Sequence, residues 1–347
     1  MPDRVLPVDD LECWVRDLLV GSGLRADAAA TVTTALLAAS RRGVDSHGVA
    51  RVPIYAQRLR AGLVNGDPHP RVERRHGATA LVDADNGPGQ VAGVYATDLS
   101  VELAREHGVG VVAVRRSTHY GSAGFYAMRA ATAGMIGVST TNSEPFVIPH
   151  GGVGHALGTN PIALAAPTVD GIFDVDMATS QVAVNRIINA RAEQRPIPEG
   201  WGVDEQGRPT TDPDLVFAAV PLGGYKGYGL AVLVEILSGV LPGAGVRHGV
   251  GRMYEELGRK QDVGSFHLAL DPERFAGLDR FAQVLTGMLG ELKAIPPAQG
   301  FDEVLVPGEP EARAQERRDR EGVPLPAVLV EALETLSSEV GVAVPFS

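Results

Sequence analysis

The stretch ATALVDADNGPGQVAGVYATDLSVELAREHGVGVVAV, residues 78–114, decides the fold class. Both of its ends, Ala78–Val82 and Gly110–Val114, are short runs of small apolar residues that predict buried strands. The residues between them, Gly89–His107, have the length and apolar spacing of a helix. A strand, a helix and a second strand in this order predict an α/β fold.

The same alternation continues toward the C-terminus. A helix is predicted over Tyr120–Ala133 and a further one over Gly229–Leu241. The segment 190–221 is rich in proline and contains Trp201, so it is interpreted as a long ordered loop, and residues 242–264 as irregular. The other predicted elements are strands at Met135–Thr141, Ile162–Ala166 and Ile172–Asp176, helices at 272–294 and 324–339, and a solvated helix face at Glu309–Arg320.

The first 65 residues have a different pattern, which predicts helices over 9–20, 25–41 and 50–61. The run Asp45-Ser46-His47-Gly48 lies in a predicted loop between the last two of these helices. Cys13 falls in the first helix and is expected to be a buried thiol.

Composition excludes several classes of protein. The chain has 347 residues, of which 44% are hydrophobic, and a net charge of −11, so a nucleic-acid surface is not expected. No apolar run approaches the roughly 20 residues that span a bilayer. The N-terminus lacks the basic and apolar regions of a signal peptide, and a single cysteine fits a reducing compartment, so a cytoplasmic protein is predicted.

Familiar ligand-binding fingerprints are missing. The nearest approach to the Rossmann glycine motif, Gly152–Gly158, is followed by Pro161 and a predicted strand, where that motif requires a helix. There is no P-loop, and the histidines lack the spacing of metal ligands. No metal site is therefore predicted.

The strongest chemical candidate is the run Gly43–Arg51. His47 titrates near neutrality and can donate a proton to a carbonyl oxygen during its reduction. Arg51 lies four residues on, which in a helix returns to the same face, and its guanidinium can hold a carboxylate through two hydrogen bonds. The alternative is that His47 caps a helix and Arg51 forms a surface ion pair.

Three further runs combine glycines with polar residues. Residues 117–124 lie between a strand and a helix, where backbone N–H groups can hold a phosphate or carboxamide, and they contain a second acid–base candidate, His119. Residues 142–161 and 174–180 are also dense in small and polar side chains, and Lys226 lies beside glycines at a helix start. Structural turns and a surface lysine remain the alternative interpretation of these runs.

Taken together, the runs from Gly43 to Gly229, with Pro307-Gly308-Glu309 near the end, resemble the malate/L-lactate dehydrogenase-like family. The resemblance implies a non-Rossmann α/β fold, NAD or NADP as the cofactor, a small carboxylate as the substrate and a homodimer. It also implies a helical segment 1–75 that carries the catalytic histidine and packs with 300–347, an α/β segment 76–118 and an NAD(P)-binding domain 119–299.

The resemblance further implies roles for individual residues. His47 is the expected acid/base with Ser46 assisting, and His119 is the rival for that role. Arg51 and Thr159 are expected to contact the substrate carboxylate. The residues expected to contact the cofactor are His119, Tyr120, Gly121, Ser122, Ala123, Asp176, Met177, Ala178, Tyr225, Lys226, Gly308 and Glu309.

One departure bears on the substrate. Where many members carry Gly-Lys, this chain has Asn185 and Arg186, and it lacks the carboxylate that imine-reducing members carry there.

The predicted activity is reversible hydride transfer between NAD(P)H and a 2-oxo or 2-hydroxy acid, an EC 1.1.1-type reaction. Reduction of a cyclic imino acid is the main alternative. A Ser46–His47 hydrolase is disfavoured because no G-x-S-x-G motif exists and neighbouring side chains in a strand point apart; a non-catalytic ligand-binding protein also stays open.

Overall fold

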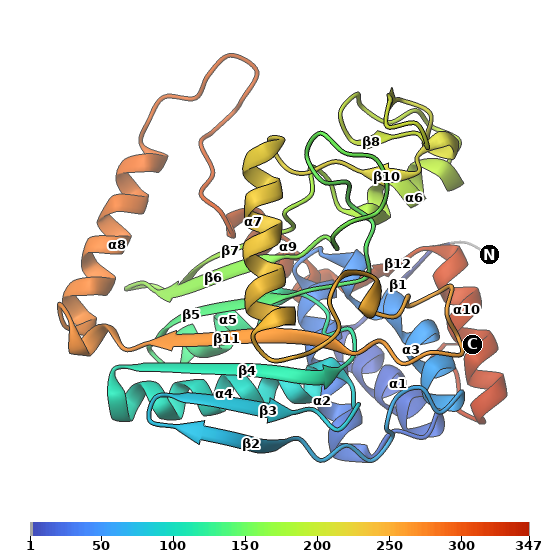
Figure 1. Ribbon diagram of the computed structural model, residues 1–347, viewed down its shortest axis with the longest axis horizontal. Helices are drawn as coiled ribbons and strands as arrows, with labels where there is room; N and C mark the ends of the chain where they lie inside the picture. Colours follow the sequence, from blue (N-terminus) through green and yellow to red (C-terminus); the bar gives the residue numbers. More distant parts are fainter. Residues whose placement is uncertain (1–2, 347) are drawn as a thin grey trace.

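A seven-stranded mixed sheet lies at the centre of the molecule (Figure 1). The computed structural model describes residues 3–346, except for the side chains of Asn185 and Ala192. Only β3 and β4 pair in parallel; the remaining neighbours are antiparallel. Across the sheet the order is β2 (Arg71–His76), β3 (Thr79–Asp83), β4 (Val109–Ser117), β11 (Val263–Leu270), β5 (Ile136–Thr141), β6 (Ile162–Pro167) and β7 (Ile172–Met177). The predicted α/β class is confirmed.

Helices cover both faces of this sheet. Helix α4 (Gly89–His107) buries Ala92, Ala96, Leu99 and Leu103, which recur at helical spacing and pack on Val112 and Val114 of β4. Helix α5 (Ala123–Thr132) packs beside it on β5 and β6. In Figure 1, helix α7 (Tyr225–Glu235), which continues in a π-helical turn at Ile236–Val240, crosses the opposite face.

A helical layer closes one end of the sheet. Helices α1 (Val8–Gly21), α2 (Ala26–Arg41) and α3 (Val52–Arg60) share one apolar core with the C-terminal helix α10 (Ala327–Val340). The indole Nε1 of Trp14 donates a hydrogen bond of 2.8 Å to Ser337 Oγ. The first strand, β1 (Arg4–Leu6), pairs with β12 (Val323–Leu325), and so the two ends of the chain are joined.

The remaining elements lie around the edge of the sheet. The predicted loop 190–221 contains short strands that form a three-stranded sheet next to helix α6. The first turn of helix α9 borders a cleft described below, whereas helix α8 contributes no residue to the wall of that cleft. The elements named in this paragraph, including the three short strands, are α6 Val184–Ala192, β8 Gly202–Val203, β9 Pro209–Thr210, β10 Ala218–Ala219, α8 Leu278–Lys293 and α9 Glu309–Glu321.

Three expectations from sequence are wrong. Strand β11, which occupies the middle of the sheet, was not predicted because Gly264 and His267 interrupt an apolar run that follows a glycine-rich segment. Cys13 is exposed, since the buried face of α1 is occupied by Leu11, Trp14 and Val15. The helix predicted from Tyr120 begins at Ala123.

No helix in the described part of the chain is long and apolar enough to cross a membrane.

Candidate active site

A cleft with a cavity volume of about 730 Å³ lies between the helical layer and the ends of strands β6 and β7. Its size is within the range of cofactor and ligand pockets. The structure brings twelve of the predicted site residues to its wall: Ser46, His47, Arg51, His119, Gly121, Ser122, Ala123, Thr159, Asp176, Met177, Ala178 and Gly308.

His47 is positioned by two short 3-10 helices, Asp45–His47 and Val49–Arg51, separated at Gly48. The expectation that one continuous helix places Arg51 on the face of His47 is therefore wrong. At Gly48 the backbone passes so close to α2 that an added Cβ would lie 2.0 Å from Ser40 Oγ. The same hydroxyl accepts the Val49 N–H at 3.0 Å. Glycine thus allows the turn that brings both side chains into the cleft.

The two candidate histidines lie together although they are far apart in sequence. The rings of His47 and His119 are stacked, with centroids 5.7 Å apart and planes inclined by 20°. Ser46 Oγ lies 2.9 Å from His47 Nδ1, so the adjacent side chains meet. The expectation that they point apart is wrong because these residues form a 3-10 turn in place of a strand.

Both histidines are neutral at pH 7. Burial lowers the pKa of His47 to about 4, and the positive charge of Arg51 contributes in the same direction. Burial also holds the pKa of His119 well below its usual range, with further contributions from Arg51 and His47. A neutral imidazole has one donor and one acceptor nitrogen, so each ring can exchange a proton or a hydrogen bond with a ligand.

Arg51 is a buried cation, with 9% of its surface exposed. Its Nε donates to Ser46 O at 2.6 Å, and a terminal nitrogen donates to the hydroxyl of Tyr254. In the described part of the chain no carboxylate forms an ion pair with it, so the alternative of a surface ion pair is wrong. A buried guanidinium without a counter-ion favours an anionic ligand.

The opposite wall of the cleft is organised by two aspartates on β7. Asp176 accepts hydrogen bonds from Ser122 Oγ at 2.6 Å and from the Gly124 N–H at 2.8 Å. Burial raises its pKa, and these two bonds oppose the rise. Asp174 pairs with Arg42, whose Nη2 lies 2.7 Å from Oδ1. The start of α5 is thereby fixed against the end of the sheet.

The backbone beside Asp174 is built for close approach. Gly308 has φ of +82°, and a Cβ there would lie 2.5 Å from Asp174 Oδ1. Gly121, just before α5, also has a positive φ of +81°, a conformation that favours glycine. Gly308, Gly121 and both histidines line this one cleft.

Comparison with known proteins identifies the family. The model for malate/L-lactate dehydrogenase matches residues 6–334. The chain belongs to the malate/L-lactate dehydrogenase family. The predicted family is thus confirmed.

Individual relatives of this malate/L-lactate dehydrogenase family member cover nearly its whole length. An NAD(+)-dependent ureidoglycolate dehydrogenase of Escherichia coli O157:H7 is 39% identical over 316 residues, 91% of this chain and 90% of the relative. A malate dehydrogenase of Pyrococcus horikoshii is 39% identical, with 97% and 96% covered. The solved structure of sulfolactate dehydrogenase from Methanocaldococcus jannaschii has a TM-score of 0.92 at 36% identity and 98% coverage of both chains.

Four of the predicted family residues lie outside the wall of the cleft. Tyr120 is buried against the ring of Tyr126, at a centroid distance of 4.6 Å. Tyr225 and Lys226 are exposed at the start of α7. Glu309 forms ion pairs with Lys293 at 2.7 Å and Arg313 at 2.6 Å.

Residues that the sequence did not single out complete the site. Tyr254 holds Arg51, and the half-buried Glu144 also lines the cleft. Burial raises the pKa of Glu144, opposed in part by the charges of Arg51 and Arg58. Behind His119 lie Tyr55 and Gln90. The sequence offered a signal only for Tyr55, which lies in the helix predicted over 50–61, four residues after Arg51.

The departure at positions 185 and 186 lies on helix α6. The side chain of Asn185 is outside the described residues, and Arg186 is exposed. Its neighbours Val184 and Ile188 line the cleft. Among the described residues, no group of three or more His, Cys, Asp or Glu side chains is placed to hold a metal ion.

Proposed function

We propose that this chain catalyses reversible hydride transfer between NAD(P)H and a 2-oxo acid or 2-hydroxy acid, with His47 as the acid/base. The observation that carries the proposal is a buried Arg51, without a carboxylate ion-pair partner among the described residues, in the same cleft wall as two stacked neutral histidines. A cation that binds carboxylate next to proton-transferring imidazoles is the arrangement that this substrate class requires. Membership of the malate/L-lactate dehydrogenase family supports the same reaction class.

The nicotinamide supplies or accepts the hydride when it is bound. Arg51, assisted by Thr159, binds the carboxylate and so places the neighbouring carbon. The unprotonated ring of His47 accepts the proton of the hydroxyl during oxidation and returns it during reduction, with Ser46 Oγ at 2.9 Å orienting the ring. The low pKa of His47 keeps its ring unprotonated at neutral pH, which is the form that can accept a proton.

The cofactor would be held by the wall opposite Arg51. Gly308 and the start of α5 leave space for a dinucleotide, and Asp176 lies where it can accept hydrogen bonds from hydroxyl groups. The binding mode would not use the Rossmann fingerprint, since the chain has none. Tyr120, Tyr225, Lys226 and Glu309 stay predicted cofactor contacts, and the choice between NAD and NADP stays open.

A substrate panel tests the proposed function. Malate, lactate, sulfolactate and ureidoglycolate, the corresponding 2-oxo acids and piperideine-2-carboxylate are each assayed with both cofactors at 340 nm. We expect turnover of at least one 2-hydroxy or 2-oxo acid. Turnover of the cyclic imine alone would replace the proposal with imino acid reduction. Cofactor binding without turnover of any compound would contradict it in favour of a non-catalytic ligand-binding protein.

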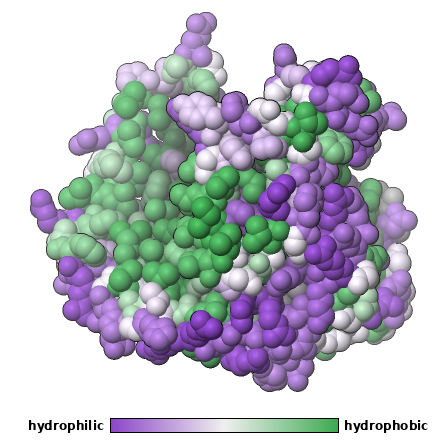
Figure 2. All heavy atoms as spheres, viewed as in Figure 1, coloured by the Kyte–Doolittle hydropathy of each residue, from purple (hydrophilic) through white to green (hydrophobic). Residues whose placement is uncertain are grey.

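We further propose that the chain forms the predicted homodimer, and that it does so through what we call the apolar face. This face comprises Leu230, Leu233, Ile236, Val240 and Leu241 of α7 and its continuation, and Val284, Met288 and Leu292 of α8. Each has between 39% and 58% of its surface exposed. Figure 2 shows hydrophobic side chains gathered over this part of the molecule. Exposed apolar residues that gather in one patch mark interaction sites, whereas isolated ones are ordinary.

The predicted division at residues 75, 118 and 299 also stays a proposal. The shared core of α1–α3 with α10 supports the pairing of the first segment with the last. A cytoplasmic location stays a prediction from the sequence.

A further inference from the structure

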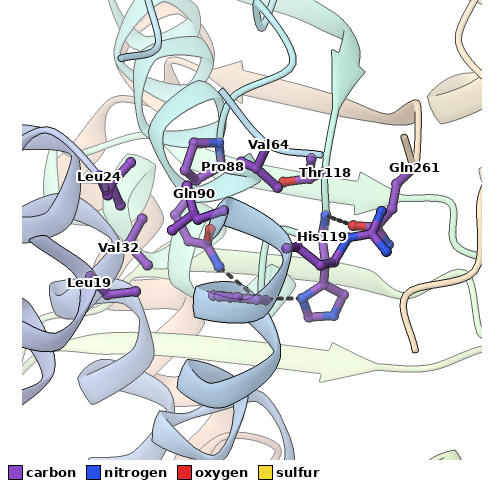
Figure 3. Close-up of a pocket in the computed structure, with 12 residues that line it drawn as sticks. Leu19, Leu24, Val32, Val64, Pro88, Gln90, Thr118, His119 and Gln261 are labelled. Atoms are coloured by element: carbon purple, nitrogen blue, oxygen red, sulfur yellow. Dashed lines mark hydrogen bonds between the residues drawn. The ribbon is translucent and has the colours of Figure 1, made fainter. Parts of the chain in front are cut away.

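A chain of three hydrogen bonds lies behind His119, on the side away from the cleft. The amide Nε2 of Gln90 lies 2.9 Å from the hydroxyl oxygen of Tyr55, and that oxygen lies 2.6 Å from His119 Nδ1. The backbone N–H of Gly121 also points at His119 Nδ1, at 3.3 Å. Figure 3 shows Gln90 and His119 joined through this chain, and Gln261 accepting the backbone N–H of His119 at 3.2 Å.

The Gly121 N–H indicates the direction of this row of hydrogen bonds, and the shorter bond from Tyr55 holds it. A backbone amide can only donate, so its contact at 3.3 Å agrees with an acceptor at His119 Nδ1 that carries no proton. The Tyr55 hydroxyl must then donate its single hydrogen to Nδ1, which leaves its oxygen to accept from Gln90. Burial raises the pKa of Tyr55, so its hydroxyl keeps this hydrogen at neutral pH. The neutral imidazole therefore carries its proton on Nε2.

The orientation of Gln90 agrees with this direction. Gln90 is fully buried, and its Oε1 has no hydrogen-bond partner among the described residues. The opposite orientation would turn Oε1 toward Tyr55, where it would compete with His119 for the hydroxyl hydrogen. In the present orientation Nε2 donates to the Tyr55 oxygen, and the hydroxyl hydrogen is left for His119 Nδ1.

This side of His119 is closed to substrate. The cavity bordered by Tyr55, Gln90 and His119 has a volume of about 20 Å³, room for little more than one water molecule. Neither Tyr55 nor Gln90 lines the large cleft, whereas His119 does. Within the described part of the chain no residue bonds His119 Nε2. The two residues thus act on the reaction only through His119.

We propose that Tyr55 and Gln90 are positioning residues that fix His119 as its Nε2–H tautomer, a permanent hydrogen-bond donor to the substrate oxygen. The inference rests on the proposed function and deepens it, because it separates the roles of the two histidines. His119 holds the oxygen of the 2-oxo acid through Nε2–H and stabilises the negative charge that develops there during reduction. His47, paired with Ser46, is then the ring that gains and loses the proton.

The test reads the tautomer directly. The full chain is labelled with ¹⁵N-histidine, and the His119 signals are assigned among the nine histidines by their loss in His119→Gln. At pH 7 we expect an unprotonated Nδ1 and a protonated Nε2. Gln90→Glu supplies a carboxylate that accepts the Tyr55 hydrogen, so the proton of His119 should move to Nδ1. Tyr55→Phe should leave a mixture of both tautomers.

Activity and a matched control complete the experiment. With the proton on the wrong nitrogen, Gln90→Glu should lower kcat by about tenfold or more while KM for the cofactor stays within about twofold. Gln90→Met, which removes the amide without supplying an acceptor, should have the smaller effect on both readouts. Tyr126→Phe removes a buried tyrosine hydroxyl that donates to Tyr120 O. This hydroxyl is not part of the hydrogen bonds that join Gln90, Tyr55 and His119, so the variant should leave the His119 signals unchanged.

Two results would overturn the inference. One is a wild-type His119 that is protonated at Nδ1; the other is a set of signals that Gln90→Glu and Tyr55→Phe do not alter. Since the nitrogen signals are measured without turnover, they test the tautomer of His119 independently of the substrate panel. A chain with the expected tautomer and no activity would contradict only the proposed function.

Discussion

At the scale of the residue, the account depends on Arg51. The sequence predicted a carboxylate-binding arginine beside His47, and Arg51 lies buried in the wall of the cleft that His47 also lines. The sequence could not show that His119 stacks on His47 or that Tyr254 holds Arg51, because those contacts join segments that only the folded sheet brings together. Side chains that contact a site residue without lining the cleft, such as Gln90, cannot be recognised from a single sequence.

Replacing Arg51 by lysine should weaken substrate binding. Lysine keeps the charge but loses the planar pair of donors, so KM for a 2-oxo acid should rise about 10- to 100-fold, as expected from the loss of a charged hydrogen bond. Steady-state kinetics measure this change. Arg60→Lys is the control, since Arg60 is exposed and pairs with Glu339. Equal KM values in the two variants would argue against Arg51 as the carboxylate-binding residue.

At the scale of the element, the spacing of apolar residues predicted helix bounds best where a helix buries one row of apolar side chains. Helix α4 occupies the predicted range Gly89–His107 because its apolar residues recur regularly and Gly108 ends it in a left-handed conformation. Strand β11 was missed because Gly264 and His267 interrupt its apolar run, although pairing with β4 and β5 places it in the middle of the sheet. The break at Gly48 was missed because it depends on the approach of Ser40 from another helix.

The turn at Gly48 should not tolerate a side chain. Gly48→Ala would place a methyl group 2.0 Å from Ser40 Oγ, so the turn or α2 must move. We expect a loss of about 1–3 kcal/mol in the free energy of unfolding and a lower kcat/KM. Denaturant unfolding and kinetics provide the two readouts. Gly287→Ala in α8 meets no atom within 4 Å and should be neutral or slightly stabilising. Indistinguishable behaviour of both variants would contradict the role of Gly48.

At the scale of the whole molecule, buried neutral histidines make stability depend on pH. Burial lowers the pKa of His267 on β11 to about 3 and that of His47 to about 4. Both values lie below the value near 6.5 of the unfolded chain, so the unfolded state binds more protons as the pH falls. The contribution to stability is complete above pH 6.5 and declines from there toward the folded-state values.

The free energy of unfolding should therefore fall between pH 7 and pH 5 by about 2 kcal/mol for each such histidine. Chemical denaturation at the two pH values measures the change. His267, which hydrogen-bonds only Thr97 and Ser265 within the described residues, permits a separate test. His267→Gln should lose its share of the pH dependence. A difference between pH 7 and pH 5 that this substitution leaves intact would contradict the assignment.

The apolar face predicts that the protein is a homodimer in solution. Wild-type protein should elute in light-scattering chromatography at twice the mass of the chain. Leu233→Asp should shift it to the monomer, because a charge would be buried in the interface. Val328→Asp is the control, since Val328 is 80% exposed on α10, outside the apolar face. A monomeric wild type, or a dimer that Leu233→Asp does not weaken, would contradict the proposed interface.

The most direct test of the central claim is His47→Ala, with turnover and cofactor binding measured separately. If His47 is the acid/base of a hydride-transfer enzyme, kcat should fall by about 100-fold or more. The dissociation constant for NAD(P)H, followed by fluorescence, should stay within about twofold, since the proposed cofactor wall lies opposite Arg51. Turnover at the wild-type rate in His47→Ala would contradict the account.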